Sequence, residues 1–185
     1  LTYDQHNLNH ERIYRLVNVF TVNGKEDRFA ATPQVLGPLF LKEYPQVGEF
    51  VRFRPVQRGV FTYEGTELYW DDVRMADENV FKVFSHTAVY GDLENALADP
   101  LSIAISESFS RQYFGERNPI GETISSETFK LRVTAVFEEL PDNSHLKYSA
   151  LLPMKLLESF GQSDDNASPQ QLFNIGIYTY FLLSP

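Results

Sequence analysis

Two groups of side chains have the residue types of a metal or catalytic site, and the first lies near the start of the chain. His6 and His10 are four residues apart, with Asp4 and Glu11 close by, and imidazole and carboxylate groups are zinc ligands. On a helix the two imidazoles would share one face. The segment has no His-Glu-x-x-His arrangement and predicts no third ligand. We therefore interpret it as polar surface near a frayed chain end and predict no metal site.

The second group has the residue types of a hydrolytic triad, namely Asp142, Ser144 and His145. Triad members come from separate elements, whereas these three lie in one loop, and the chain contains no Gly-x-Ser-x-Gly elbow. Neighbouring residues of one loop cannot point toward one another in the acid-to-histidine-to-serine hydrogen-bond chain that a triad requires. Local turn hydrogen bonds from Asp142 or Asn143 and from Ser144 are therefore the favoured interpretation. His86 is most simply a residue at the C-terminus of a helix.

The remaining polar patterns also fail to predict a reactive site. The paired carboxylates Asp71-Asp72 and Glu138-Glu139 would point to opposite faces of a strand, so neither pair converges. The chain has no Gly-rich phosphate-binding loop with a Walker lysine. It has no cysteine, which excludes disulfides, Cys-ligated zinc and thiol nucleophiles. We predict no catalytic residue and no cofactor.

Aromatic residues are frequent, with 15 Phe and 10 Tyr, and most of them fall at core spacing. The exceptions are Tyr63, Tyr69 and Trp70, which flank a turn predicted at Glu64-Gly65. An exposed aromatic cluster at this turn is a candidate partner surface.

Composition places the chain among globular domains that do not bind polyanions. It has 185 residues, 43% of them hydrophobic, which is enough for a substantial core. The net charge of -9 disfavours nucleic acid and anionic lipid headgroups as partners. No apolar run approaches the roughly 18 residues of a membrane span, so we expect a soluble chain. No helix cap or tail follows the last apolar residues, which suggests an excised piece.

The clearest local pattern runs from residue 96 to residue 121. Alternation over 101–105 predicts a half-buried strand, and Ser106 is a plausible N-cap for a helix that ends before Gly115. Gly121, which is free to take positive φ, then turns the chain toward a short strand at 123–124.

The rest of the chain predicts an α+β fold. Thr32-Pro33 is expected to begin an amphipathic helix that ends at Tyr44, and Asn23-Gly24 to form a hairpin turn. The strand-helix-strand order over 13–54 would be half of a ferredoxin-like split unit. Further strands are expected near 13–22, 28–31, 50–54, 60–63, 67–70, 73–76, 129–137, 148–152 and 178–183, and short helices at 77–84, 93–97 and 153–160. The last strand should return to the sheet begun by Ile13, and 161–170 should be the most mobile internal loop.

Several short motifs occur in an order that resembles one known family. They are Tyr3-Asp4-Gln5-His6 near the start, Ala31-Thr32-Pro33 with Glu43-Tyr44-Pro45, Ser102 to Ser106 (SIAIS), Tyr113-Phe114-Gly115 with Asn118-Pro119-Ile120-Gly121, and Pro141 to Leu146 (PDNSHL). In this order the chain resembles the periplasmic, or extracytoplasmic, core domain of MacB-like and FtsX-like ABC transporter permeases.

The resemblance implies a two-part body. A membrane-proximal, porter-like α/β subdomain would comprise 1–73 plus 171–185, with 74–170 inserted as a mixed α/β, sabre-like subdomain. It also implies a periplasmic domain of an inner-membrane protein, lying between its transmembrane helices.

The function implied by the resemblance is mechanical and non-catalytic. The domain would transmit ATP-driven motion to a periplasmic substrate or partner, in export, efflux or lipoprotein release. ATP hydrolysis would reside in a separate cytoplasmic ABC ATPase, and an outer-membrane or periplasmic protein is a possible partner. The full permease would be a dimer and this fragment a monomer.

Two other classes of function remain open at this point. One is a free-standing cell-envelope domain that binds a peptide or glycan through the Trp70 region or the 161–170 loop. The other is an enzyme that uses Ser144 and His145.

Overall fold

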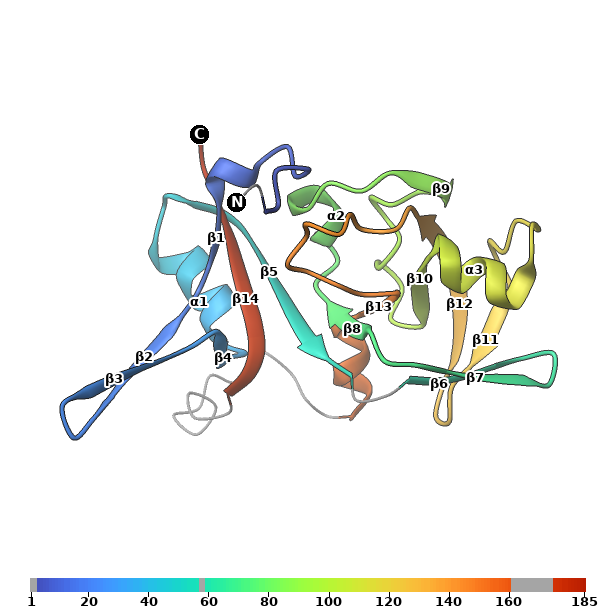
Figure 1. The fold of residues 1–185 in the computed structure, drawn as a ribbon, viewed down its shortest axis with the longest axis horizontal. Helices are drawn as coiled ribbons and strands as arrows, with labels where there is room; N and C mark the ends of the chain where they lie inside the picture. The colour runs from blue at the N-terminus through green and yellow to red at the C-terminus, as the bar shows by residue number, and fades with distance from the viewer. Residues whose placement is uncertain (1–2, 57–58, 161–174) are drawn as a thin grey trace.

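The fold is a 12-stranded mixed sheet with helices packed on it and a separate two-stranded sheet, β2–β3, seen in a computed structural model that describes residues 3–56, 59–160 and 175–185 (Figure 1). Most elements are strands, which confirms the α+β class. The strands are β1 (Ile13–Arg15), β2 (Asn18–Val22), β3 (Lys25–Phe29), β4 (Ala31–Pro33), β5 (Val47–Pro55), β6 (Gly59–Tyr63), β7 (Thr66–Trp70), β8 (Val73–Ala76), β9 (Ala88–Gly91), β10 (Ser102–Ser106), β11 (Thr123–Ser125), β12 (Lys130–Phe137), β13 (Ala150–Pro153) and β14 (Ile175–Leu183). The helices are α1 (Leu36–Glu43), α2 (Val80–Val83) and α3 (Glu107–Phe114), with 3-10 turns η1 (His10–Arg12) and η2 (Met154–Phe160).

The strand order places both ends of the chain in one half of the sheet. The order is β1-β14-β5-β8-β13-β10-β12-β11-β6-β7, with β4 on β14 and β9 on β12. Ile13 pairs with Leu182 in an antiparallel ladder, as expected for a last strand that returns to the first. The chain therefore enters and leaves at the same end of the molecule (Figure 1).

Local sequence signals explain the elements that were predicted well. The Ser106 hydroxyl accepts the Phe109 N–H at the start of α3, and Gly115 ends the helix at φ 63°. Two hairpins close on two-residue turns whose residues all have positive φ, namely Asn23-Gly24 and Glu64-Gly65. These signals lie within a few residues of the structure that they specify.

The entry to α1 differs from the prediction. Thr32 and Pro33 do not begin the helix but form β4, which pairs with β14. The buried Thr32 Oγ1 lies 2.8 Å from Thr179 Oγ1 and donates to the Ile177 carbonyl. These hydrogen bonds occupy the Thr32 hydroxyl, which is therefore not used to cap a helix. The helix α1 begins only at Leu36. Leu39 of α1 is 43% exposed.

Other predicted boundaries also move. The strand expected over 13–22 splits into β1 and β2, because Leu16 donates its N–H to Thr179 and the chain then leaves the sheet. The helix expected over 77–84 is only α2, which has no side-chain cap, and the Asp77 side chain before it binds Arg52. Residues 93–97 form turns rather than a helix, and 154–160 is a 3-10 helix. The loop predicted at 161–170 lies outside the described residues.

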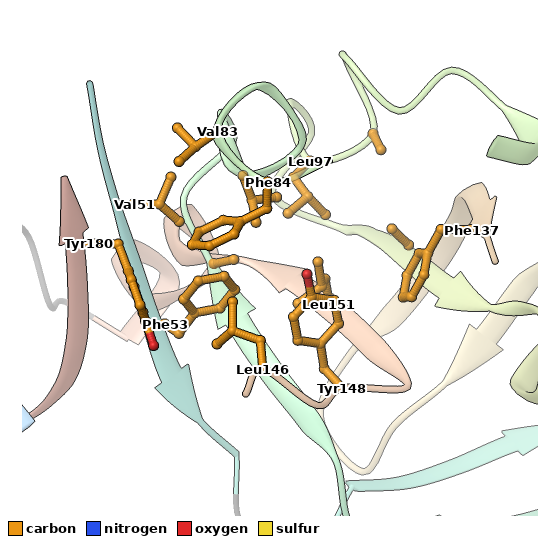
Figure 2. Close-up of a cluster of buried hydrophobic side chains, with 14 of the residues drawn as sticks. Val51, Phe53, Val83, Phe84, Leu97, Phe137, Leu146, Tyr148, Leu151 and Tyr180 are labelled. Atoms are coloured by element: carbon orange, nitrogen blue, oxygen red, sulfur yellow. The ribbon is translucent and has the colours of Figure 1, made fainter. Parts of the chain in front are cut away.

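The largest core cluster joins the two halves of the sheet (Figure 2). Phe53 of β5 is fully buried, and its ring lies 5.6–5.7 Å from the rings of Phe84, Tyr148 and Tyr180. Tyr180 comes from β14, whereas Phe84 and Tyr148 come from the middle of the chain. A single aromatic side chain thus contacts elements from both halves.

We expect Phe53→Ala to destabilise the protein by roughly 3–5 kcal/mol, because it removes a buried ring and leaves a cavity between three others. Urea unfolding measures the change. Leu39→Ala is the control, since its exposed side chain should alter the free energy of unfolding by less than about 0.5 kcal/mol. Equal small losses in both variants would contradict a core that depends on Phe53.

Candidate functional site

A group of polar side chains at the edge of the core joins distant segments of the chain, and we define it as the Asp4 cluster of Asp4, Ser144, His145 and Tyr180. The Asp4 carboxylate accepts the His145 backbone N–H at 3.0 Å and lies 2.5 Å from His145 Nδ1. Ser144 Oγ lies 3.5 Å from the same carboxylate. On the other side of the imidazole, His145 Nε2 is 2.8 Å from the Tyr180 hydroxyl. The cluster joins the N-terminal segment, the 141–146 loop and β14.

Local backbone structure holds Asp4 in position. Asp4 has φ 62°, a left-handed conformation that Asp tolerates better than most residues. Its N–H donates to the Asn143 carbonyl and its own carbonyl accepts from Asn7. Asn7 is buried and accepts the Ser85 N–H through its side chain. The N-terminal turn is thus bonded to two separate loops of the middle of the chain.

The chemistry of the cluster favours bridging over catalysis. Asp4 is an acceptor, so a neutral His145 carries its proton on Nδ1 and accepts the Tyr180 hydroxyl at Nε2. Burial raises the pKa of Tyr180 to about 12, which keeps the phenol protonated at neutral pH. The imidazole therefore faces a phenol that gives up its proton reluctantly, and Ser144 faces the carboxylate. The arrangement holds three segments together but does not activate a nucleophile.

An open recess of about 410 Å³ lies beside the cluster. Its border includes Asp4, His145 and Tyr180, together with Arg15 and Ile13 of β1. The recess thus lies where the first and last strands of the sheet meet the 141–146 loop.

A second titratable pair lies nearby in an apolar environment. The His86 ring stacks on Tyr148 and meets the edges of Phe81 and Phe137. Its Nδ1 lies 3.0 Å from the Phe84 carbonyl and its Nε2 lies 2.7 Å from the Tyr148 hydroxyl. Burial lowers the pKa of His86 to about 4. His86 follows α2 as predicted, but it lies partly buried among aromatic rings that the sequence did not reveal.

A buried ion pair joins the two halves on the other side of β5. Arg52 is 3% exposed, and its guanidinium donates to both carboxylate oxygens of Asp77, at 2.6 and 2.9 Å. Asp77 also accepts the Arg52 backbone N–H. Asn79 donates to Glu49 and to the Phe50 carbonyl, which adds further bonds between β5 and the turn before α2. These contacts fix the position of α2 relative to β5.

The predicted metal and triad residues have other partners. Only 10–12 is helical near the N-terminus, as a 3-10 turn, so His6 and His10 do not share a helix face. In the described part of the chain, no three metal-ligating side chains gather. Asp142 is fully exposed and lies 3.9 Å from Lys147 Nζ. The sequence argument missed Asp4 as the partner of His145, because the two are 141 residues apart.

The paired carboxylates also have separate positions. Asp71 and Asp72 are exposed after β7. Glu139 accepts the Ser108 N–H in the first turn of α3 at 2.8 Å, and hydrogen bonds from this serine hold the pKa of the carboxyl below its usual range in spite of partial burial. Glu139 therefore stabilises the start of α3.

Comparison with known proteins identifies the family. The family model of MacB-like periplasmic core domains matches residues 2–183. The chain belongs to this family. It is therefore the extracytoplasmic, periplasmic-type domain of an ABC-type transporter permease, and membership implies an ATPase partner in the full-length protein. Among curated proteins, none gives a significant match.

Solved structures show the same fold at low identity. A domain of a protein described as a permease, from Porphyromonas gingivalis, is 21% identical with a TM-score of 0.79, covering 97% of this chain and 76% of that one. The extracellular domain of the noncanonic ABC-type transporter YknZ from Gram-positive bacteria is 14% identical with a TM-score of 0.63, covering 94% and 84%. The periplasmic region of MacB from Actinobacillus actinomycetemcomitans is 14% identical with a TM-score of 0.66, covering 94% and 75%.

The aromatic cluster predicted on this MacB-like domain is only partly at the surface. Tyr63 is buried, and its hydroxyl donates to Glu122. Trp70 is partly buried and stacks on Phe109 with ring centroids 4.4 Å apart. Tyr69 is 60% exposed, and its hydroxyl donates to Glu67. The expectation of three exposed rings was wrong for Tyr63 and Trp70, because α3 covers them, and a partner role at Tyr69 stays a prediction.

We expect Asp4→Ala to release the N-terminal turn from the body of the domain. Hydrogen bonds to a charged acceptor contribute about 1.5–3 kcal/mol each, so amide exchange in residues 3–9 and 143–146 should accelerate about tenfold or more. Hydrogen-exchange mass spectrometry measures this. Asp142→Ala, an exposed carboxylate of the same loop, is the control and should leave exchange unchanged. Identical exchange in the two variants would show that Asp4 does not hold the turn.

Stability should fall in acid because of His86. Its folded-state pKa of about 4 lies below the ordinary value of 6.5, so the unfolded chain binds more protons between these pH values. The free energy of unfolding should therefore decrease by up to about 3 kcal/mol as pH falls from 6.5 toward 4. Urea titrations at several pH values measure the slope.

His86→Gln should remove most of this slope, and His10→Gln, at an exposed position, should keep it. A smaller slope remains from His6, whose pKa is lowered first by its own burial. Parallel pH profiles for the wild type and His86→Gln would contradict this assignment.

Proposed function

We propose that this domain transmits motion as one stiff body, from transmembrane helices driven by a cytoplasmic ABC ATPase to a periplasmic substrate or partner. The observation that carries the proposal is the aromatic core around Phe53, which contains residues of β14 and of the middle of the chain and has Ile13 of β1 packed against it. Motion applied at the chain ends would thereby reach the distant half without a hinge. The domain itself would perform no bond-making chemistry.

The chain ends are suited to receive such motion. β1 and β14 are antiparallel neighbours, so both connections to the rest of a permease would leave from one place. The Asp4 cluster bonds the incoming segment to the 141–146 loop, and the Arg52–Asp77 pair bonds β5 to the turn before α2. Polar contacts on two sides of β5 would resist rotation of one half against the other.

We propose that the two parts are those expected from the resemblance, 1–73 plus 171–185 and the inserted 74–170. The β6–β7 hairpin belongs by sequence to the first part, but β6 pairs with β11 of the inserted part. Because this hairpin belongs to one part by sequence and pairs with a strand of the other, it would further hold the two parts together. The proposed roles are export, efflux or lipoprotein release. Family membership rules out the free-standing domain considered from sequence, and the competing proposal is that this permease domain binds a peptide or glycan without transmitting motion.

The test measures distances in the full-length permease with its ATPase. Spin labels at Glu43→Cys and Glu116→Cys report the internal geometry of the domain, because both residues are exposed, and Glu43 ends α1 whereas Glu116 follows α3, two helices that lie on opposite sides of the fold (Figure 1). A third label in the ATPase, paired with Glu116→Cys alone, reports motion of the whole domain. We expect the internal distance to stay the same between nucleotide-free and ATP-bound states, while the distance to the ATPase changes.

An ATPase variant that cannot bind ATP is the control and should show neither change. A shift in the internal distance would mean that the halves hinge, which contradicts transmission by a stiff body. No change in either distance with a competent ATPase would favour the binding domain instead.

A further inference from the structure

The recess beside the Asp4 cluster has the size of a small-molecule site, and the proposed mechanical role does not use it. Its volume of about 410 Å³ lies within the roughly 300–1,000 Å³ typical of such sites. Residues of the N-terminal turn, β1, the 141–146 loop and β14 border it, together with Phe84. The Asp4 cluster bonds three of these segments to one another, so the recess is formed before any ligand enters.

Arg15 gives the recess a positive charge that has no carboxylate partner. Arg15 pairs with Tyr180 across the β1–β14 ladder, so the two side chains leave the sheet on the same face. Arg15 is exposed, and no carboxylate of the described residues forms an ion pair with it. Its guanidinium is a planar fork of N–H donors that matches the geometry of a carboxylate.

The neighbouring polar groups leave Arg15 available to a ligand. Among the described residues that border the recess, Asp4 is the one carboxylate, and both of its oxygens already meet His145, at the backbone N–H and at Nδ1. Tyr3 is 57% exposed, and its hydroxyl has no hydrogen-bond partner in the described part of the chain. The recess therefore presents a guanidinium and a phenol O–H, and both can donate to an anion.

The remaining lining is apolar and suits a hydrocarbon body. Ile13 lies two residues before Arg15 on β1, on the same face of the strand, and packs against the aromatic core. The rings of Phe84 and Tyr180 meet edge to face with centroids 5.3 Å apart (Figure 2). Covering these side chains would favour a ligand with an apolar part, whereas a small inorganic anion has nothing to place there.

We propose that the recess binds a small organic acid, with its carboxylate on Arg15 and the Tyr3 hydroxyl and its apolar body against Ile13 and Phe84. One guanidinium balances one carboxylate, whereas a phosphate dianion would leave a second negative charge near Asp4. An anionic bilayer is a poor occupant, because the net charge of -9 opposes its approach.

This inference goes beyond the proposed function and does not rest on it. A domain that hinges and a domain that moves as one body would present the same recess. The experiments below therefore leave the mechanical proposal untouched whatever their result.

Isothermal titration calorimetry with octanoate tests the ligand class. Octan-1-ol and octyltrimethylammonium carry the same hydrocarbon chain with a neutral and a cationic head. We expect octanoate to bind saturably and the other two to bind at least about tenfold more weakly, because only the carboxylate can bond to Arg15. Equal binding of octan-1-ol would overturn the proposal, and so would octanoate that fails to saturate the chain at millimolar concentrations.

Substitutions of Arg15 test the position of the carboxylate. Arg15→Gln should weaken octanoate binding about tenfold or more, and Arg15→Lys, which keeps the charge but not the fork, should have intermediate affinity. Arg28→Gln is the matched control, because it removes the same charge from a side chain that is 73% exposed and lies outside the lining. It should bind octanoate as the wild type does. Equal affinity of Arg15→Gln and the wild type overturns the proposal.

Methyl NMR tests where the apolar body lies. Octanoate should shift the methyl resonances of Ile13 and leave those of Ile124, which is fully buried in the other core cluster, unchanged. Shifts at Ile124 without shifts at Ile13 would place the ligand elsewhere and overturn the proposal.

Sedimentation with phosphatidylglycerol vesicles separates a dissolved acid from a bilayer as the occupant. Neither the wild type nor Arg15→Gln should sediment with the vesicles. Sedimentation of the wild type that Arg15→Gln abolishes would assign Arg15 to a lipid surface and overturn the proposal.

Discussion

The packing of β5 between β14 and β8 is the constraint on which the rest of the structure depends. β5 pairs with β14 on one side and with β8 on the other, so it is the strand through which the chain-end half meets the middle of the chain. Alternation along β5 places Val51 and Phe53 in the aromatic core, while Arg52 points away from it to Asp77. Breaking a buried ion pair costs about 3–5 kcal/mol. Both faces of one strand therefore hold the two halves together.

Polar contacts set the positions of segments that the core alone does not fix. The Asp4 carboxylate meets a loop 141 residues away, and His145 extends the connection to Tyr180 on β14. Such contacts are directional, so they fix the position of a segment as well as stabilising it. They fix the N-terminal turn beside β1 and β14, where the first and last strands of the sheet meet the 141–146 loop. The family assignment and the geometry are thus consistent, and the mechanical role follows from both as a proposal.

The sequence predicted those elements whose signals are local. β12 alternates over eight residues, α3 has its cap and stop within one segment, and both hairpin turns carry a glycine with positive φ at their second position. It failed where a distant contact outweighed a local signal. Thr32 looked like a helix cap, but it pairs with Thr179 of β14, 147 residues away. Tyr63 and Trp70 looked exposed beside a turn, but Phe114 and Phe109 of α3 pack against them.

The candidate site was the part least accessible from sequence. His145 was noticed, but its partners Asp4 and Tyr180 are joined to it only by the fold, and nothing in their spacing indicates the contact. The family, in contrast, was predicted from short motifs, because their order along the chain is retained even where each motif alone is common.

Native-state hydrogen exchange tests most directly whether the halves form one body. The amides of β5 and β14 should exchange with the same free energy as those of β12 and β13, and with the same dependence on denaturant, because all four strands open only when the whole domain unfolds. A distinctly lower exchange free energy for β5 and β14, with β12 and β13 still protected, would show that the chain-end half unfolds by itself and would contradict the account.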